Sequence, residues 1–267
     1  MKLALIAFTL ALVTPRIFAQ PATCADPTAA VFDVASVKPI QQSAGSFNVR
    51  SRPDSLTADG TLAHILEYAF NLHDFQIAGR PSWLSSATWD IAIKVDQPPA
   101  NWDTLSNDSR NAIHRQRMIT ALAQRFSLKC HFETRQLPVY NLILAKGGPK
   151  VALGPTPADA QKKGSFSSHD DGASVVMQSN GTALDLLATN LVRVLGRTVI
   201  NKTGLTGIYD LTLTYAPNPT DTAADSAAAS GPTVFTALEE QLGLRLEPAK
   251  GPVPILIIDS VDRPSEN

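Results

Sequence analysis

The side chains best suited to acid–base chemistry are few and widely spaced. Asp90 and Asp210 each follow an aromatic residue at the start of an alternating apolar segment. Hydrolases that use general acid–base catalysis commonly carry a pair of carboxylates, so these two aspartates are the candidates for a hydrolytic site. Because one occurs in each of two similar segments, we favour a shared structural role, such as accepting hydrogen bonds from the turn amides after Gly204–Gly207. The residues to which we give this structural role are Trp89, Asp90, Gly204, Gly207, Tyr209 and Asp210.

A thiol and an imidazole are adjacent at Cys130 and His131. A cysteine nucleophile must lie within hydrogen-bond reach of its base, but neighbouring side chains of a strand point to opposite faces of the sheet. We therefore predict a buried Cys130 and an exposed His131 that do not act together. The acid–histidine run His169-Asp170-Asp171 is predicted to be a solvated charged turn.

Known catalytic and metal-binding motifs are missing from the sequence. It has no phosphate-binding Gly-Lys-Ser/Thr loop, no Gly-x-Ser-x-Gly elbow and no His-Glu-x-x-His helix. No two of the five histidines are spaced to share one face of a helix. We therefore assign no catalytic residue, expect no metal and no cofactor, and favour a non-enzymatic role.

The two cysteines, Cys24 and Cys130, allow two interpretations. In an oxidising compartment they can form a disulfide, which would stabilise the fold by about 4–5 kcal/mol because it closes a long loop. Alternatively, Cys130 is a small buried apolar residue of an alternating segment. The sequence leaves both open.

Residues 1–19 have the pattern of a secretory signal peptide. Lys2 precedes the apolar run Leu3–Val13, and Ile17-Phe18-Ala19 forms a cleavage box before Gln20. This run is much shorter than the roughly 20 residues needed to span a bilayer. We therefore expect an exported protein, periplasmic or extracellular, with no transmembrane segment after signal cleavage.

Composition excludes a disordered chain. Hydrophobic residues make up 44% of the 267 residues and charged residues 18%, enough apolar surface to fold. Twenty-three basic side chains oppose 24 acidic ones, for a formal net charge of −1. Such a balance gives no attraction to polyanions, so we expect no nucleic-acid partner.

Three blocks of the first half recur in the same order in the second half, which predicts an internal duplication. We expect an N-terminal segment, 20–46, with one strand at Phe32–Lys38, then a first copy over 47–146. A linker, 147–173, leads to the second copy, 174–267, whose repeated part ends near residue 261. The recurring blocks are Gly60–Leu66 with Gly181–Leu187, Trp89–Ile93 with Tyr209–Leu213, and Thr120–Leu122 with Thr236–Leu238.

Periodicity predicts the same elements in each copy. Leu62, Ile65 and Leu66 begin a helical apolar stripe for which Thr61 is the N-cap. A helix, two strands, a second helix and a strand-turn-strand follow a leading strand, which predicts an α+β fold made of two tandem helix-on-sheet sandwiches. In the first copy we expect Phe47–Arg52, Thr61–Leu72, Gln76–Ala78, Trp89–Val95, Ser109–Phe126, and Leu128–Thr134 with Val139–Ala145. In the second we expect Val175–Ser179, Thr182–Leu195, Thr198–Ile200, Tyr209–Tyr215, Thr233–Leu242, and Leu244–Glu247 with Ile255–Val261.

The sequence carries a set of short motifs, Phe32–Pro39, Gln76–Gly79, Leu137–Tyr140, Lys146–Lys150, Lys202–Gly207, Thr236–Leu244 and Pro264–Asn267. Together they resemble a large family of exported proteins that is abundant in soil acidobacteria and carries a domain of unknown function. Arg80, where the family tends to have a glycine, and Cys130, at an expected apolar site, depart from the pattern. Some members of the family resemble the extracytoplasmic part of sensor-type membrane metallopeptidases, but we expect no membrane part of that kind in this protein.

Each copy also resembles, more weakly, the short N-terminal domain of secretins and TonB-dependent receptors, a periplasmic module that works by protein contact. This resemblance implies a non-enzymatic module that binds an envelope protein or a small ligand. The alternative is a secreted hydrolase with a site between the two copies, using Asp90 or Asp210.

Overall fold

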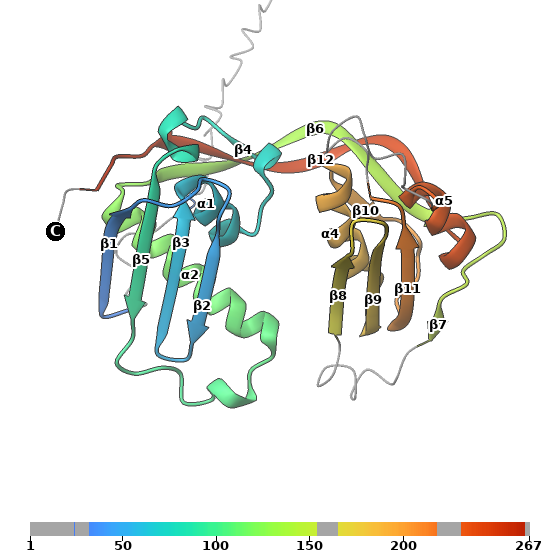
Figure 1. Cartoon of the computed structure of the whole chain (residues 1–267), viewed down its shortest axis with the longest axis horizontal. Helices are drawn as coiled ribbons and strands as arrows, with labels where there is room; N and C mark the ends of the chain where they lie inside the picture. The colour runs from blue at the N-terminus through green and yellow to red at the C-terminus, as the bar shows by residue number, and fades with distance from the viewer. Residues whose placement is uncertain (1–23, 25–31, 154–164, 218–230, 265–267) are drawn as a thin grey trace, which may run out of the picture.

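The computed structural model describes residues 24, 32–153, 165–217 and 231–264. The predicted signal peptide, 1–19, and residues 20–23 and 25–31 of the N-terminal segment lie outside the described residues. Helices and three four-stranded sheets make up the described part (Figure 1), and this confirms the predicted α+β class.

The first lobe is a sheet with the strand order β1-β5-β3-β2, in which every neighbouring pair is antiparallel. Two helices pack against it, and the hydroxyl of Thr61 accepts the N–H of His64 at 3.3 Å as the predicted N-cap. The elements are β1 (Val34–Ile40), β2 (Asn48–Arg52), β3 (Ser55–Thr61), α1 (Leu62–Phe70), η1 (Asp74–Gln76), β4 (Ile77–Ala78), η2 (Ser82–Ser85), β5 (Thr88–Lys94), η3 (Trp102–Thr104) and α2 (Asn107–Arg125).

The second lobe has the strand order β7-β11-β9-β8. If the strands of each lobe are renumbered from its own first strand, β1 or β7, both lobes have the same order, 1-5-3-2. The segment expected to be a linker, 147–173, contributes two of these strands, so that part of the chain is not simply a connection. The elements are β7 (Ala152–Leu153), β8 (Ser165–Asp170), β9 (Val175–Thr182), α4 (Leu184–Leu195), β10 (Val199–Asn201), β11 (Tyr209–Tyr215), α5 (Val234–Ala237) and η4 (Leu238–Leu242).

Two long strands, β6 (Lys129–Leu144) and β12 (Leu244–Ser260), join the lobes (Figure 1). They pair with each other in antiparallel register along nearly their whole length. Our prediction of a strand-turn-strand in each copy was therefore wrong, because each segment is one continuous strand of 16 or 17 residues.

Pro138 lies within β6 and faces away from β12. The N–H of Tyr140 points away from β12 and donates to the carbonyl of Thr198 at 2.9 Å. Two residues earlier, Pro138 faces the same side, where a missing N–H costs no ladder hydrogen bond. Proline at this position is therefore compatible with an uninterrupted strand.

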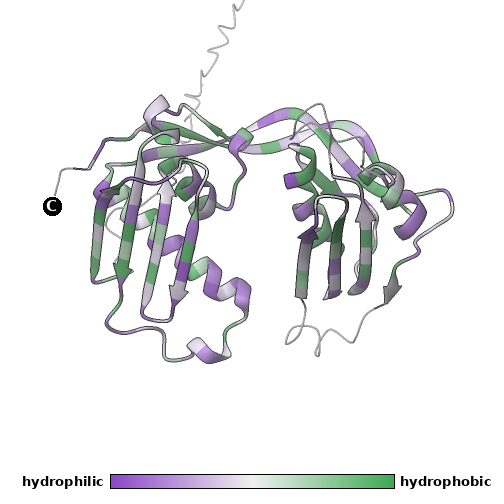
Figure 2. Ribbon diagram, viewed as in Figure 1, coloured by the Kyte–Doolittle hydropathy of each residue, from purple (hydrophilic) through white to green (hydrophobic). Residues whose placement is uncertain are grey.

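Each lobe is completed by a long strand that comes from the other half of the chain. In the first lobe the short strand β4 pairs in parallel with β12, and in the second lobe the short strand β10 pairs in parallel with β6. The core of the first lobe accordingly includes Leu256 and Ile258 of β12, whereas the core of the second includes Leu142 of β6. Figure 2 shows apolar residues alternating with polar ones along the strands, as expected for sheets with one covered face.

Candidate functional site

Asp90 and Asp210 are not brought together. Asp90 lies on β5 and Asp210 on β11, in separate sheets. The carboxylate of Asp210 accepts the N–H of Gly181 at 2.6 Å, not an amide of the Gly204–Gly207 turn as we had suggested. The register between β9 and β11 shifts at this point, and the irregular backbone presents the Gly181 amide to the carboxylate.

Asp90 belongs to a polar row that sequence reasoning missed. The pairing of β3 with β5 places it opposite Asp59, and the pairing of β1 with β5 places Lys38 on its other side. Asn48 donates to Asp59 at 2.8 Å, and a guanidinium nitrogen of Arg50 lies 3.8 Å from the same carboxylate. Only the strand register reveals this row, which balances two like charges across the sheet.

The aromatic residues at these strand starts are packing residues. Trp89 is buried, and its ring meets Phe126 edge to face at 5.4 Å. Tyr209 is also buried, and a Cβ at Gly207 would lie only 2.8 Å from its hydroxyl oxygen, so a side chain there would require the tyrosine ring to shift. Gly204 adopts a φ of +72°, a conformation that glycine reaches without strain.

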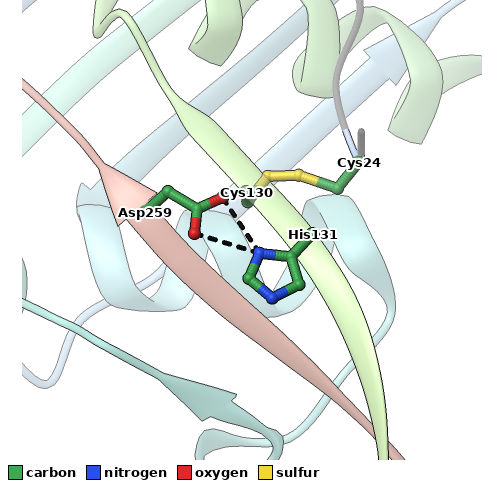
Figure 3. The surroundings of a disulfide bond; sticks show 4 residues. All are labelled: Cys24, Cys130, His131 and Asp259. Atoms are coloured by element: carbon green, nitrogen blue, oxygen red, sulfur yellow. Dashed lines mark hydrogen bonds and ion pairs between the residues drawn. A yellow bond between two sulfur atoms is a disulfide. The ribbon is translucent and has the colours of Figure 1, made fainter. Parts of the chain in front are cut away.

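The structure joins Cys24 and Cys130 in a disulfide, with the two Cα atoms 5.3 Å apart (Figure 3). The N–H of Cys24 also donates to the carbonyl of Cys130 at 3.0 Å. The bond fixes Cys24 against the start of β6. Cys130 is buried, whereas the adjacent His131 projects away from the disulfide.

His131 forms a charged network on the surface of the third sheet, whose strand order is β10-β6-β12-β4. Its Nδ1 lies 3.0 Å from the carboxylate of Asp259, and its Nε2 lies 3.5 Å from that of Glu133. The hydrogen bond to Asp259 is the main cause that raises the pKa of His131. Arg135 in turn donates to Glu133 at 2.8 Å. Sequence reasoning missed Asp259 because it lies on the partner strand.

A cavity of about 550 Å³ lies beside α2 in the first lobe. Burial lowers the pKa of Arg117, one of its lining residues, while the nearby carboxylate of Asp54 raises it. The Arg117 guanidinium lies 5.6 Å from the centre of the Trp102 ring and donates to the carbonyl of Pro53 at 3.0 Å. The lining residues are Phe32, Asp33, Val95, Asp96, Gln97, Pro99, Ile113, Gln116 and Arg117.

Within the described residues, no three His, Cys, Asp or Glu side chains gather as metal ligands do. In the same part of the chain, no helix combines the length and the apolar character needed to cross a membrane. The run His169-Asp170-Asp171 ends β8 and begins a turn, in which Asp171 accepts the N–H groups of Ala173 and Ser174 at 2.9 and 2.7 Å.

Comparison with known proteins identifies a family. No curated protein and no solved structure matches this chain. The model of the family DUF3738, described as a protein of unknown function, matches residues 63–261. The match begins in α1 and ends just beyond β12, so it covers the second lobe and the two joining strands but leaves out β1, β2 and β3 of the first lobe. The chain therefore belongs to the DUF3738 family.

Proposed function

We propose that this protein is an exported, non-enzymatic binding module of the cell envelope that takes up an extended segment of another protein along the edge strand β8. The predicted signal peptide supports export, and the open edge of the second lobe supports the mode of binding. In such complexes the backbone of a partner peptide adds one strand to a sheet.

The observation that carries the proposal is the outer edge of β8, along which no other strand of the described residues pairs. This strand pairs with β9 over its whole length and is the last strand of its sheet. Phe166 packs on the core of the lobe, and the residues that follow, Ser167–Asp170, are exposed. None of the six residues of β8 is a proline, a lysine or an arginine.

The other long edges carry the features that block strand addition. Folded proteins protect exposed edges with charged side chains and proline. Edge strand β2 has Arg50 and Arg52, and β1 has Lys38 followed by Pro39. On β1 the guanidinium of Arg125 also caps the carbonyl of Ala35, at 3.0 Å from its Nε. β8 has no proline, lysine or arginine, and its one aspartate, Asp170, stands at its last position, which supports its use as a binding edge.

The test is selection of peptides from a random displayed library on the full-length mature protein, followed by hydrogen exchange. We expect selected peptides to slow exchange of the outward-facing amides of Ser165–Asp170. The double substitution Ser167→Lys/Ser168→Lys should abolish binding, because lysines at an edge oppose a further strand. Thr212→Lys, an exposed position on the interior strand β11, is the matched control and should bind normally.

Peptides that bind without protecting β8, or that bind the double variant as well as the wild-type protein, would contradict this function. The alternative, a secreted hydrolase using Asp90 or Asp210, gains no support from their positions. The two carboxylates lie in different sheets, and Asp210 is already bonded to Gly181.

A further inference from the structure

We infer that the cavity beside α2 binds a short apolar peptide with free termini, whose carboxylate meets Arg117 and whose ammonium meets Asp33 and Asp96. This site lies in the first lobe and is independent of the edge strand proposed above. It rests on the separation of opposite charges across one cavity of about 550 Å³.

The deep end of the cavity is cationic. Arg117 lines it and is only 3% exposed. Its guanidinium is held in place by the carbonyl of Pro53 and by the ring of Trp102. Trp102 is itself fixed by an edge-to-face contact with His114 at 5.1 Å. A guanidinium held in this way presents N–H donors with a geometry suited to a carboxylate.

The outer end is anionic. Asp33 and Asp96 both line the cavity and are exposed. Asp33 accepts the N–H of Asp96 at 2.6 Å, which fixes the two residues next to each other. Among the described residues, neither the Asp33 carboxylate nor the Asp96 carboxylate forms an ion pair with Arg117 within 4.0 Å. The opposite charges are therefore separated, and a ligand with charges at both ends can satisfy both.

The other lining residues of the cavity are mostly apolar. They are Phe32, Val95, Pro99 and Ile113, together with the amides Gln97 and Gln116. Cavities of roughly 300–1,000 Å³ with apolar walls and a few placed polar groups are typical ligand sites. A dipeptide or tripeptide with aliphatic side chains combines the apolar surface with the two terminal charges.

The experiment is titration of the full-length mature protein with leucyl-leucine, followed by tryptophan fluorescence and calorimetry. Two blocked probes, N-acetyl-leucyl-leucine and leucyl-leucinamide, each lack one terminal charge. We expect leucyl-leucine to bind and each blocked probe to bind about tenfold or more weakly, because a hydrogen bond to a charged group is lost at one end. Equal affinity for all three probes, or no binding at millimolar concentration, would overturn the inference.

Asp96→Asn carries the mutational test, because the residue is exposed and its loss should not disturb the core. This variant should weaken leucyl-leucine but leave N-acetyl-leucyl-leucine unchanged, since the acetylated probe has no ammonium. Asp103→Asn, an exposed aspartate of η3 outside the cavity lining, should bind like the wild-type protein. If Asp96→Asn lost affinity equally for leucyl-leucine and N-acetyl-leucyl-leucine, the assignment of the outer end would be overturned. The same loss of affinity in Asp103→Asn would overturn it as well.

Discussion

His114 illustrates how burial controls a single residue. Its side chain is 2% exposed, and its Nδ1 has no hydrogen-bond partner among the described residues. Burial, with the positive charge of Arg117 as a second cause, lowers the pKa of His114 to about 4. The imidazole is therefore neutral in the folded protein at neutral pH, and it packs as an aromatic ring against Trp102.

This lowered pKa predicts loss of stability in mild acid. Between about pH 6.5 and pH 4 the imidazole of His114 is protonated in the unfolded state but not in the folded state. The contribution of neutral His114 to the free energy of unfolding is fully present above about pH 6.5. It is lost as the pH falls toward 4, by up to about 3 kcal/mol. Urea unfolding of wild-type and His114→Phe proteins at several pH values measures it. We expect a smaller loss in the variant, and an identical pH dependence would contradict the role of His114.

At this scale, the sequence predicted the cap of the first helix but not the hydrogen-bond partner of Asp210. The Thr61 N-cap was predicted because a cap and its amide partner lie within one turn, and the structure confirms it. The Asp59–Asp90 and His131–Asp259 neighbours were not predicted. Each pair is made by the register of two strands that are far apart in sequence, and no local spacing encodes that register.

Among the elements, β6 and β12 were the most poorly predicted. Residues Glu133–Gln136 of β6 are all exposed, although Val253 and Ile255, which pair with this stretch from β12, are buried in a small third cluster. An apolar alternation, the sequence signal of a strand, is therefore absent there. By contrast, β11 is covered on one face by the second core, and Tyr209–Tyr215 was predicted with its bounds as found.

The disulfide predicts a measurable stabilisation of the elements that it connects. It closes a loop of 106 residues, for which loop-closure entropy gives about 4–5 kcal/mol. We expect a reducing agent to lower the free energy of unfolding of the wild-type protein by up to this amount. Cys24→Ser should show the lower stability from the start and should not respond to the reducing agent. Equal sensitivity of the variant, measured by urea unfolding, would exclude the disulfide as the cause.

For the whole molecule, the decisive feature is that each core contains part of a strand that enters from the other half of the chain. Leu256 of β12 and Leu142 of β6 are both fully buried, one in each core. The two lobes are therefore completed by crossing strands and not by separate stretches of sequence. We expect their folding to be coupled through β6 and β12.

This crossing predicts which lobe each substitution destabilises. Truncation of a buried leucine to alanine costs about 2–5 kcal/mol. Leu256→Ala, late in the sequence, should increase hydrogen exchange in α1 of the first lobe. Leu142→Ala, in the first half of the sequence, should increase it in α4 of the second lobe. The reverse pattern in native-state hydrogen exchange would contradict the crossed arrangement.

The sequence by itself determined the α+β class, the positions of most helices and short strands, and the inward orientation of Cys130, because these depend on periodicity and capping within a few residues. The internal duplication stays a prediction, and the shared strand order of the two lobes agrees with it. Only the tertiary structure decided that β6 and β12 are continuous and cross between lobes, that Asp90 and Asp210 stay apart, and that Arg117, Asp33 and Asp96 line one cavity. These features arise from pairing between distant segments, whose register is set by the packing of whole lobes.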